Sequence, residues 1–200
     1  MTPITVLRSL SDRFIRQRQP SGYRPGETLA HVRRNFGGLS FEALEPTRGR
    51  FGTADGLLCF EAQERTHSEL LMHLVLTDFV LQVPSRESGA LQIELRHTGA
   101  VRRTGLTCKR RAGDTAALVA LEAVLLHDQP LRTALMPLDF KRLVIGRGEA
   151  GVWTVSLEHM GASEVVNRMP SFRRYIRLDD RQRDGLLQSL SALQRILQTL

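Results

Sequence analysis

The sequence predicts an α+β protein, with a largely antiparallel sheet and helices packed on one of its faces. Strand-like runs follow one another without helical crossovers, which favours antiparallel pairing. Amphipathic helices come after each group of strands, and helices in that position cover one side of such a sheet. At 200 residues, the chain is long enough to bury a conventional core without metals or disulfides.

The first twenty residues predict an amphipathic helix that precedes a single domain over residues 21–200. An apolar stripe runs through residues 3–18 and consists of Val6, Leu7, Leu10 and Phe14. A basic amphipathic helix can lie on an anionic membrane. Because this stripe is short, we expect the helix to pack on its own domain instead.

The first half of the domain, residues 21–128, reads as helix, strands and helix. A helix is predicted from Gly26 to Asn35, with Thr28 as its cap. Strands are then predicted at residues 39–45, 48–53, 57–65, 69–82, 90–97 and 101–110. Asp114 caps a helix over residues 115–127. The strand over 69–82 is apolar on both parities, so we expect a cover on each side: the N-terminal helix, a partner subunit or a ligand.

The second half, residues 129–200, repeats this order of elements, which predicts a pseudo-repeat of two related halves. A short helix at 130–136 precedes strands at 139–147, 151–159, 163–169 and 172–178. Asp179 caps a long final helix whose leucines recur at helical spacing. Trp153, Val155 and Leu157 share one apolar parity, so we expect them in the core beneath that helix.

The charge is positive but unevenly placed. The formal charge is +7, and nearly all of the positive charge is arginine. Residues 1–50 carry a net +5, whereas residues 51–90 carry −4, so a basic tail is not indicated. Cys59 and Cys108 are isolated, which indicates reduced thiols. No signal-peptide core or membrane-length apolar run is present, so we expect a cytoplasmic protein.

Motifs for catalysis, metals and cofactors are weak. Gly146 to Gly151 matches GxGxxG, but the following residues alternate as a strand, so we interpret the motif as a hairpin turn. The six histidines show no spacing typical of metal ligands. Ser163 lacks the surroundings of a nucleophile elbow. We therefore predict no metal and no cofactor, and we favour a protein that is not an enzyme.

The most informative stretch is residues 161–178, because its second half separates into two faces as a strand. Arg173, Tyr175 and Arg177 fall on one face, and Phe172, Arg174, Ile176 and Leu178 fall on the other. Two guanidiniums around one aromatic ring can bind a phosphate or carboxylate and stack a flat group. The plain alternative is a solvated strand face with a partly buried tyrosine.

This row predicts a non-catalytic binding protein for an anionic small molecule or an acidic protein partner. Asn167, Arg168 and Lys109 are candidate residues for the rim of the site. A second hypothesis is an enzyme that uses Glu158 or Glu164 in a sheet-lined pocket. A third is a nucleic-acid or anionic-membrane-surface binder, but nucleic acid is disfavoured because only Tyr175 offers a convincing stacking surface. The oligomeric state stays open.

Two stretches, Ala134 to Lys141 and Gly161 to Leu178, resemble an uncharacterised proteobacterial family of unknown function. The resemblance covers most of the chain. It implies a bacterial, cytosolic origin. The shared motifs carry no known chemistry, so the resemblance implies no site residues.

Overall fold

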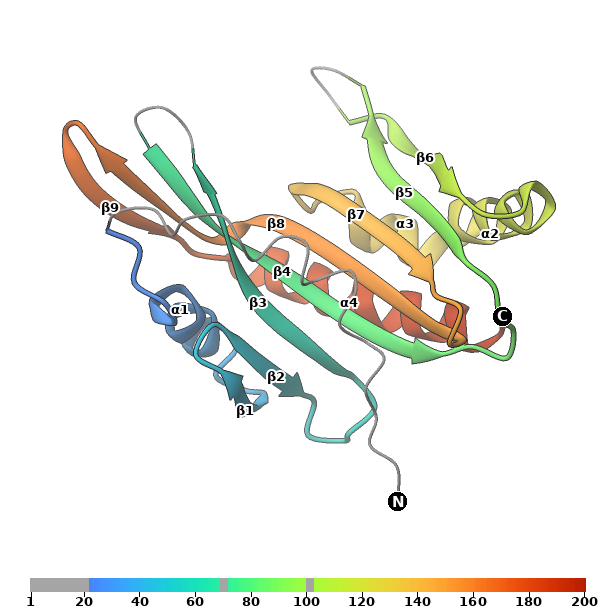
Figure 1. Ribbon diagram of the computed structural model, residues 1–200, viewed down its shortest axis with the longest axis horizontal. Coiled ribbons are helices and arrows are strands. Elements are labelled where there is room, and N and C mark those ends of the chain that lie inside the picture. The colour runs from blue at the N-terminus through green and yellow to red at the C-terminus, as the bar shows by residue number, and fades with distance from the viewer. Residues whose placement is uncertain (1–21, 69–71, 100–102) are drawn as a thin grey trace.

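A computed structural model describes residues 22–68, 72–99 and 103–200. The predicted helix over residues 3–18 lies outside these ranges. The described strands are β1 (Ser40–Glu45), β2 (Arg48–Gly52), β3 (Cys59–Ser68), β4 (Met72–Pro84), β5 (Leu91–Thr98), β6 (Gly105–Ala112), β7 (Phe140–Arg147), β8 (Val152–Arg168) and β9 (Ser171–Ile176). They form one antiparallel sheet in the order β1-β2-β3-β4-β8-β7-β5-β6, and β9 also pairs with β8 (Figure 1).

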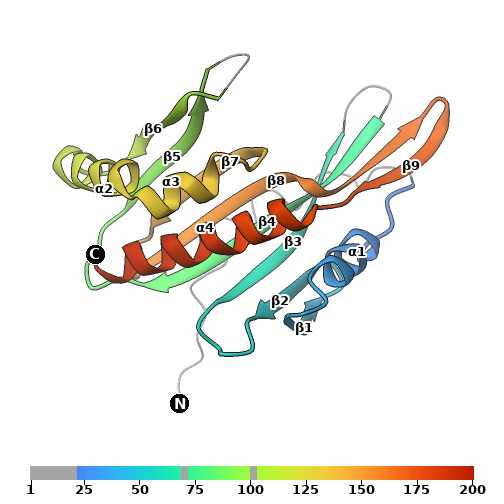
Figure 2. The same cartoon turned by 180° about the vertical axis from the view of Figure 1, so that it is seen from behind.

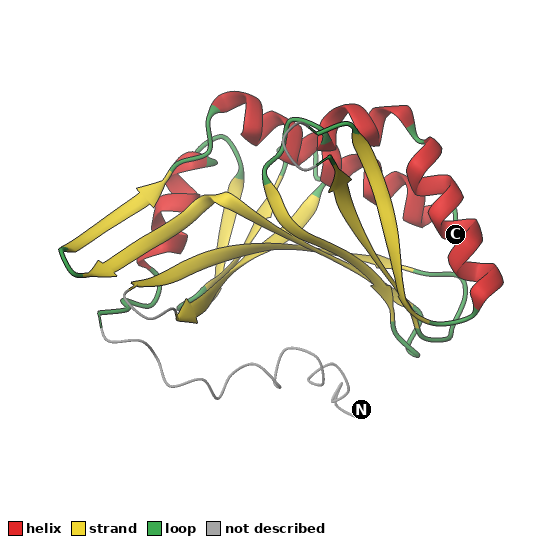
Figure 3. Ribbon diagram, turned by 90° about the horizontal axis from the view of Figure 1, so that it is seen from above, coloured by secondary structure: helices red, strands yellow, loops and turns green. Residues whose placement is uncertain are grey.

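The described helices lie together on one face of an arched sheet (Figures 2 and 3). They are α1 (Glu27–Asn35), α2 (Thr115–His127), α3 (Gln129–Leu135) and α4 (Asp180–Gln198). This arrangement confirms the α+β class with helices on one side. We call the side with helices the helix face and the other side the open face.

β8 organises the sheet because it is long enough to pair with three strands. It pairs with β4 on one side, with β7 along its first half and with β9 along its second half. The sequence predicted two strands here, over 151–159 and 163–169, and that prediction was wrong. The strand continues through Gly161 and Ala162, where Ala162 adopts a left-handed backbone conformation with φ 70°, and the pairing with β4 shifts register nearby.

The core lies between the sheet and α4, as the sequence predicted. Trp153, Val155 and Leu157 are buried and belong to the same apolar cluster as Leu186 and Leu190 of α4. Burial of these apolar surfaces is the main source of stability in such a layered fold. β4 is buried on both faces, also as expected, since both Val75 and its neighbour Leu76 are nearly inaccessible to solvent.

The aspartates predicted as caps correctly marked the starts of α2 and α4. Asp114 accepts a hydrogen bond from the Ala117 amide, and Asp179 forms a capping box with Gln182. Gly148 and Gly151 close the turn between β7 and β8, with Gly151 at φ 68°, so the GxGxxG match is a hairpin turn. Strands of both predicted halves share one sheet, and the pseudo-repeat stays a prediction.

Candidate functional site

Arg173 and Tyr175 of the predicted row contact α1, whereas Arg177 is exposed. Tyr175 pairs with Glu164 of β8, and Arg173 pairs with Val166, so both residues point to the helix face. The parity expected from the sequence is therefore confirmed for Arg173 and Tyr175. This face is not free along its whole length, because His31 and Glu27 of α1 contact Tyr175 and Arg173.

α1 is held there by a carboxylate from a distant strand. Its N-cap is Gly26, which has no side chain, so Thr28 is not the cap that the sequence predicted. Instead, Glu64 of β3 accepts hydrogen bonds from the amides of Gly26 and Leu29 at 3.0 and 2.8 Å. The Tyr23 hydroxyl donates to the same carboxylate at 2.6 Å. A buried carboxylate thus satisfies the free amides of the helix start and complements its dipole.

Arg173 is occupied by two carboxylates. Its guanidinium donates to both oxygens of Glu164, from Nε at 2.8 Å and from Nη2 at 2.9 Å, and its Nη1 lies 3.2 Å from Glu27 of α1. The Thr28 hydroxyl also donates to Glu164 at 3.3 Å. Burial raises the pKa of the Glu164 carboxyl, but the hydrogen bonds and charge of Arg173 outweigh it and hold that pKa below its ordinary value. Arg173 therefore joins the hairpin to α1.

Tyr175 stacks on His31 of α1, with ring centroids 4.5 Å apart and an interplanar angle of 17°. Its hydroxyl oxygen is shielded from solvent and makes no hydrogen bond within the described ranges. Burial, only partly offset by the positive charges of Arg34 and Arg177, raises the pKa of Tyr175 well above its ordinary value. The phenol therefore stays protonated and keeps a free hydrogen-bond donor.

Two cations flank this ring. Arg34 of α1 is exposed and donates to Nδ1 of His31 at 2.8 Å, which requires an unprotonated Nδ1. Arg177 follows β9, is exposed, and forms no ion pair within the part of the chain that the structure describes. It lines a shallow hollow of about 320 Å³ together with Leu178, Asp179 and Asp180. We call His31, Arg34, Tyr175 and Arg177 the cation cluster.

The predicted rim residues are not brought to the cation cluster. Asn167 and Arg168 lie near the tip of the hairpin, opposite Phe172 and Ser171, and the Asn167 amide donates to the Met169 carbonyl at 3.2 Å. Lys109 lies on β6, which β5 and β7 separate from β8. Lys109 and its neighbours Arg110 and Arg111 therefore lie apart from the arginines of β9.

The model of a family described as Protein of unknown function (DUF3156) matches residues 34–197. The chain belongs to the DUF3156 family. No curated protein and no solved structure matches it. The match includes Arg34, Tyr175 and Arg177 and begins after His31. The description of the DUF3156 family names no chemistry, so any function has to be inferred from the geometry of the site.

The two carboxylates considered for catalysis do not converge. Glu164 points to the helix face, whereas Glu158 pairs with Asp78 and lies on the open face. There, Arg65 contacts both Glu158 and Asp78, and Arg142 lies 3.9 Å from Glu158. Each carboxylate is neutralised by arginine on its own side of the sheet. Glu158 and Glu164 therefore cannot act as an acid and base on one substrate.

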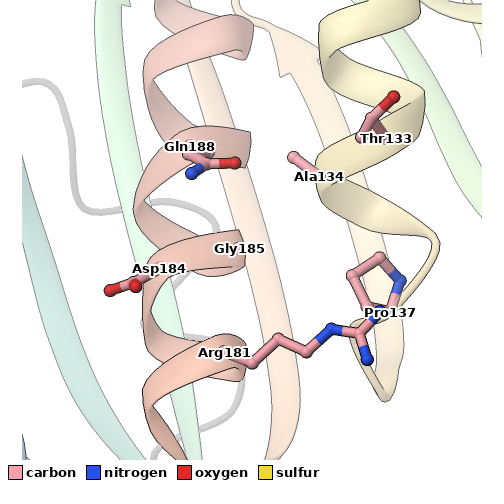
Figure 4. Close-up of a pocket in the computed structure, with 7 residues that line it drawn as sticks. All are labelled: Thr133, Ala134, Pro137, Arg181, Asp184, Gly185 and Gln188. Atoms are coloured by element: carbon pink, nitrogen blue, oxygen red, sulfur yellow. The ribbon is translucent and has the colours of Figure 1, made fainter.

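A second hollow, of about 460 Å³, lies between α3 and α4 (Figure 4). Ala134 and Gly185 lie where the two helices approach, and a Cβ atom on Gly185 would lie 3.3 Å from the Ala134 carbonyl oxygen. Arg181 extends from α4 toward Pro137 across one end. The hollow is open and lined partly by exposed side chains, and nothing in it is a buried polar group without a partner. We therefore place the candidate site at the cation cluster.

The described residues contain no group of three or more side chains suited to hold a metal ion. Within those same ranges, no helix is both long and apolar enough to cross a membrane. His73 and His159 are fully buried. The Nε2 atom of His159 accepts a hydrogen bond from the Asp139 amide at 3.0 Å, which gives this ring a structural role.

Sequence reasoning missed three residues that build the site: His31, Arg34 and Glu64. His31 and Arg34 are three residues apart in a predicted helix, so they share one of its faces. That spacing was the only signal available. The contact between α1 and β9 joins segments about 140 residues apart, and no local pattern reports such a contact.

Proposed function

We propose that this protein binds an anionic group, a carboxylate or phosphate, at the cation cluster without catalysing a reaction. The observation that carries the proposal is the unused Tyr175 hydroxyl between two guanidiniums that lack a carboxylate partner in the described ranges. The two exposed arginines offer directed, charge-assisted hydrogen bonds to an oxyanion, and the protonated phenol adds a donor once a neighbouring side chain moves off its covered oxygen.

The bound anion is proposed to belong to a small molecule or to an acidic protein surface. The hollow beside Arg177 is shallow, with a volume of about 320 Å³, which suits one charged group and a short substituent. Asp179 and Asp180 line the same hollow. Their carboxylates repel part of any bound anion, so we expect modest affinity for simple anions and for acidic peptides.

No observation favours the two other hypotheses to the same degree. Catalysis by Glu158 or Glu164 would need a carboxylate free of arginine, and each one is paired. A nucleic-acid surface would need a broad face of unpaired cations with aromatic rings for stacking. On the open face, Arg50 contacts Glu42 and Glu61, and Arg65 contacts Asp78.

Isothermal titration calorimetry with three probes tests the proposal: inorganic phosphate, citrate and a hexaglutamate peptide. We expect binding of at least one probe, weakening with added salt because exposed charges are screened. The double variant Arg34→Ala, Arg177→Ala should bind at least about tenfold more weakly, since two charge-assisted contacts are lost. Its melting curve should stay close to that of the unsubstituted protein.

The matched control is Arg174→Ala. Arg174 is also exposed and lies on β9, but it has the opposite parity and points away from the cation cluster. This variant should keep the affinity of the unsubstituted protein. Equal affinity in the double variant and the control would exclude the cation cluster as the binding site. A preference for hexaglutamate over citrate and phosphate would favour the acidic protein partner.

A further inference from the structure

α2 is apolar on all sides, which is unusual for a helix at the margin of a protein. Only Glu122 and His127 are ionisable among its residues, Thr115 to His127. Its inner side buries Leu118, Leu121 and Leu125 beside β5 and β6. Figure 2 shows α2 at the edge of the molecule, next to the outermost strand β6.

The outer side of α2 is an exposed apolar stripe. Val119 and Val124 are 46% and 39% exposed, although most valines in folded proteins are buried. Ala116, Ala120 and Ala123 are exposed beside them. Their helical spacing places all five residues on one face, which we call the α2 stripe. No charged residue lies on this face between Ala116 and Val124.

We propose that the α2 stripe is a self-association surface, covered in a dimer by the α2 stripe of a second copy of this chain. A two-fold axis brings the same patch of both copies together, so a patch needs to be complementary only to itself. An uncharged stripe of valine and alanine meets this condition. The alanines also allow the two helix axes to approach closely.

Charge at the helix ends fixes the direction of the pair. Ala120 is the middle of the stripe. A two-fold axis that passes between the two copies at Ala120, perpendicular to α2, makes the two α2 helices antiparallel. The N-terminal end, with the exposed Asp114, then lies beside His127 of the second copy. The helix dipoles also align favourably in this arrangement. A parallel pair would place like ends together.

Pairing through the neighbouring strand edge is opposed by charge. β6 ends the strand order, so its outer edge is unpaired in the described sheet. That strand carries Lys109, Arg110 and Arg111 in succession, and charged side chains on an edge strand hinder strand addition. Arg110 and Arg111 are already paired with Glu122 and Glu94, so a second copy added here would have to fit around these ion pairs and beside the exposed Lys109. The contact is therefore made by the helices.

The expected dimer is weak. Thirteen helical residues span about 20 Å, so the stripe covers less than the roughly 800 Å² per partner of a standard stable interface. We expect a dissociation constant on the order of micromolar. Sedimentation velocity across a wide concentration range should show a shift from monomer to dimer. A monomer at every concentration would overturn the proposal.

Val119→Glu tests whether the α2 stripe makes the contact. It places a carboxylate from each copy in the interface and should weaken the dimer at least about a hundredfold, because like charges are desolvated together. Glutamate favours helix at this exposed position, so the melting curve should be retained. The control is Ser191→Glu at an exposed position of α4. A dimer that persists in Val119→Glu would place the interface elsewhere.

Cross-linking gives a second, independent test. In a Cys59→Ser background, Ala120→Cys places a thiol at the proposed axis, whereas Ser191→Cys places one on α4. Cys108 remains, but burial raises the pKa of its thiol to about 12, so it is a poor nucleophile at neutral pH. Mild oxidation should give disulfide-linked dimers of the Ala120→Cys variant only. Equal cross-linking of both variants would contradict the assigned contact.

Discussion

Arg173 shows how one side chain can connect two segments that are distant in sequence. It bridges Glu164 of β8 and Glu27 of α1, and Glu164 is almost fully buried. Arg173→Ala would leave the Glu164 carboxylate buried without its cation. We expect it to lower the free energy of unfolding by about 3 kcal/mol, the usual scale for breaking such a pair. Urea denaturation at pH 7 measures this loss.

Two further variants separate charge from packing at this position. Arg174→Ala removes an exposed arginine of the same strand and should change stability by no more than about 0.5 kcal/mol. Arg173→Ala combined with Glu164→Gln should be more stable than Arg173→Ala alone, because no unpaired charge remains. If the single and double variants were equally unstable, the role of Arg173 would be packing rather than charge.

At the residue scale, the sequence indicated which residues share a face but not what covers that face. The alternation along residues 172–177 follows from strand geometry and needs no tertiary information. The position of α1 over Tyr175 depends on Glu64 and Glu164, which belong to strands far along the chain. From the sequence alone, Arg173, Tyr175 and Arg177 therefore looked like a solvent-exposed binding site. In the structure, Arg173 is paired with Glu164 and Glu27 and has mainly a structural role.

At the scale of elements, α4 buries more residues than any other described helix, and the sequence predicted its position. Leu190 is fully buried in the cluster between α4 and the sheet. Leu190→Ala should destabilise the protein by about 2 to 5 kcal/mol, since it removes buried methyl groups and leaves a cavity. Chemical denaturation gives the value. Ser191→Ala, at the exposed neighbouring position, serves as the control, and a similar loss in both variants would argue against docking of α4 through Leu190.

Helix and strand positions were largely predictable because their signals are local. The helix over 115–127 was predicted with the bounds that the structure has, since Asp114 marks its start. The strand order was not predictable. β4 pairs with β8, and β5 pairs with β7, across long sequence separations. The sequence also predicted a break between two strands near residues 160–162, which the structure does not have. Pairing with β4 and β9, which are distant in sequence from one another, keeps β8 extended on both sides of Ala162.

For the whole molecule, the ion pairs on both faces of the sheet make stability depend on pH. The carboxyls of Glu94 and Glu164 are buried, which raises their pKa values, but paired arginines outweigh burial and hold both pKa values below their ordinary value. Burial lowers the pKa values of His97 and His159 below their ordinary value, because it disfavours the charged ring. In all four groups, the unfolded chain binds protons at a higher pH than the folded chain does.

Stability is therefore expected to fall as the solution is acidified, in two steps. Between about pH 6.5 and 8 all four contributions are complete, and the free energy of unfolding should be nearly constant. Between about pH 6.5 and 5, His97 and His159 take up protons more readily in the unfolded chain than in the folded chain, which lowers the free energy of unfolding. Below about pH 4.5, protonation of the unfolded carboxyls removes the contributions of Glu94 and Glu164. Urea denaturation at a series of pH values measures both steps.

The His159→Gln variant assigns the first step. The ring of His159 accepts a hydrogen bond from the Asp139 amide through Nε2, and Nδ1 lies 3.3 Å from the Gly161 carbonyl oxygen, so the neutral ring is the one that fits. Glutamine does not titrate in this range, so the variant should lose part of the dependence between about pH 6.5 and 5. Its stability at pH 7 should also be lower. The step below about pH 4.5 should persist, because Glu94 and Glu164 keep their arginines. An unchanged profile between about pH 6.5 and 5 would show that His159 does not contribute to acid sensitivity.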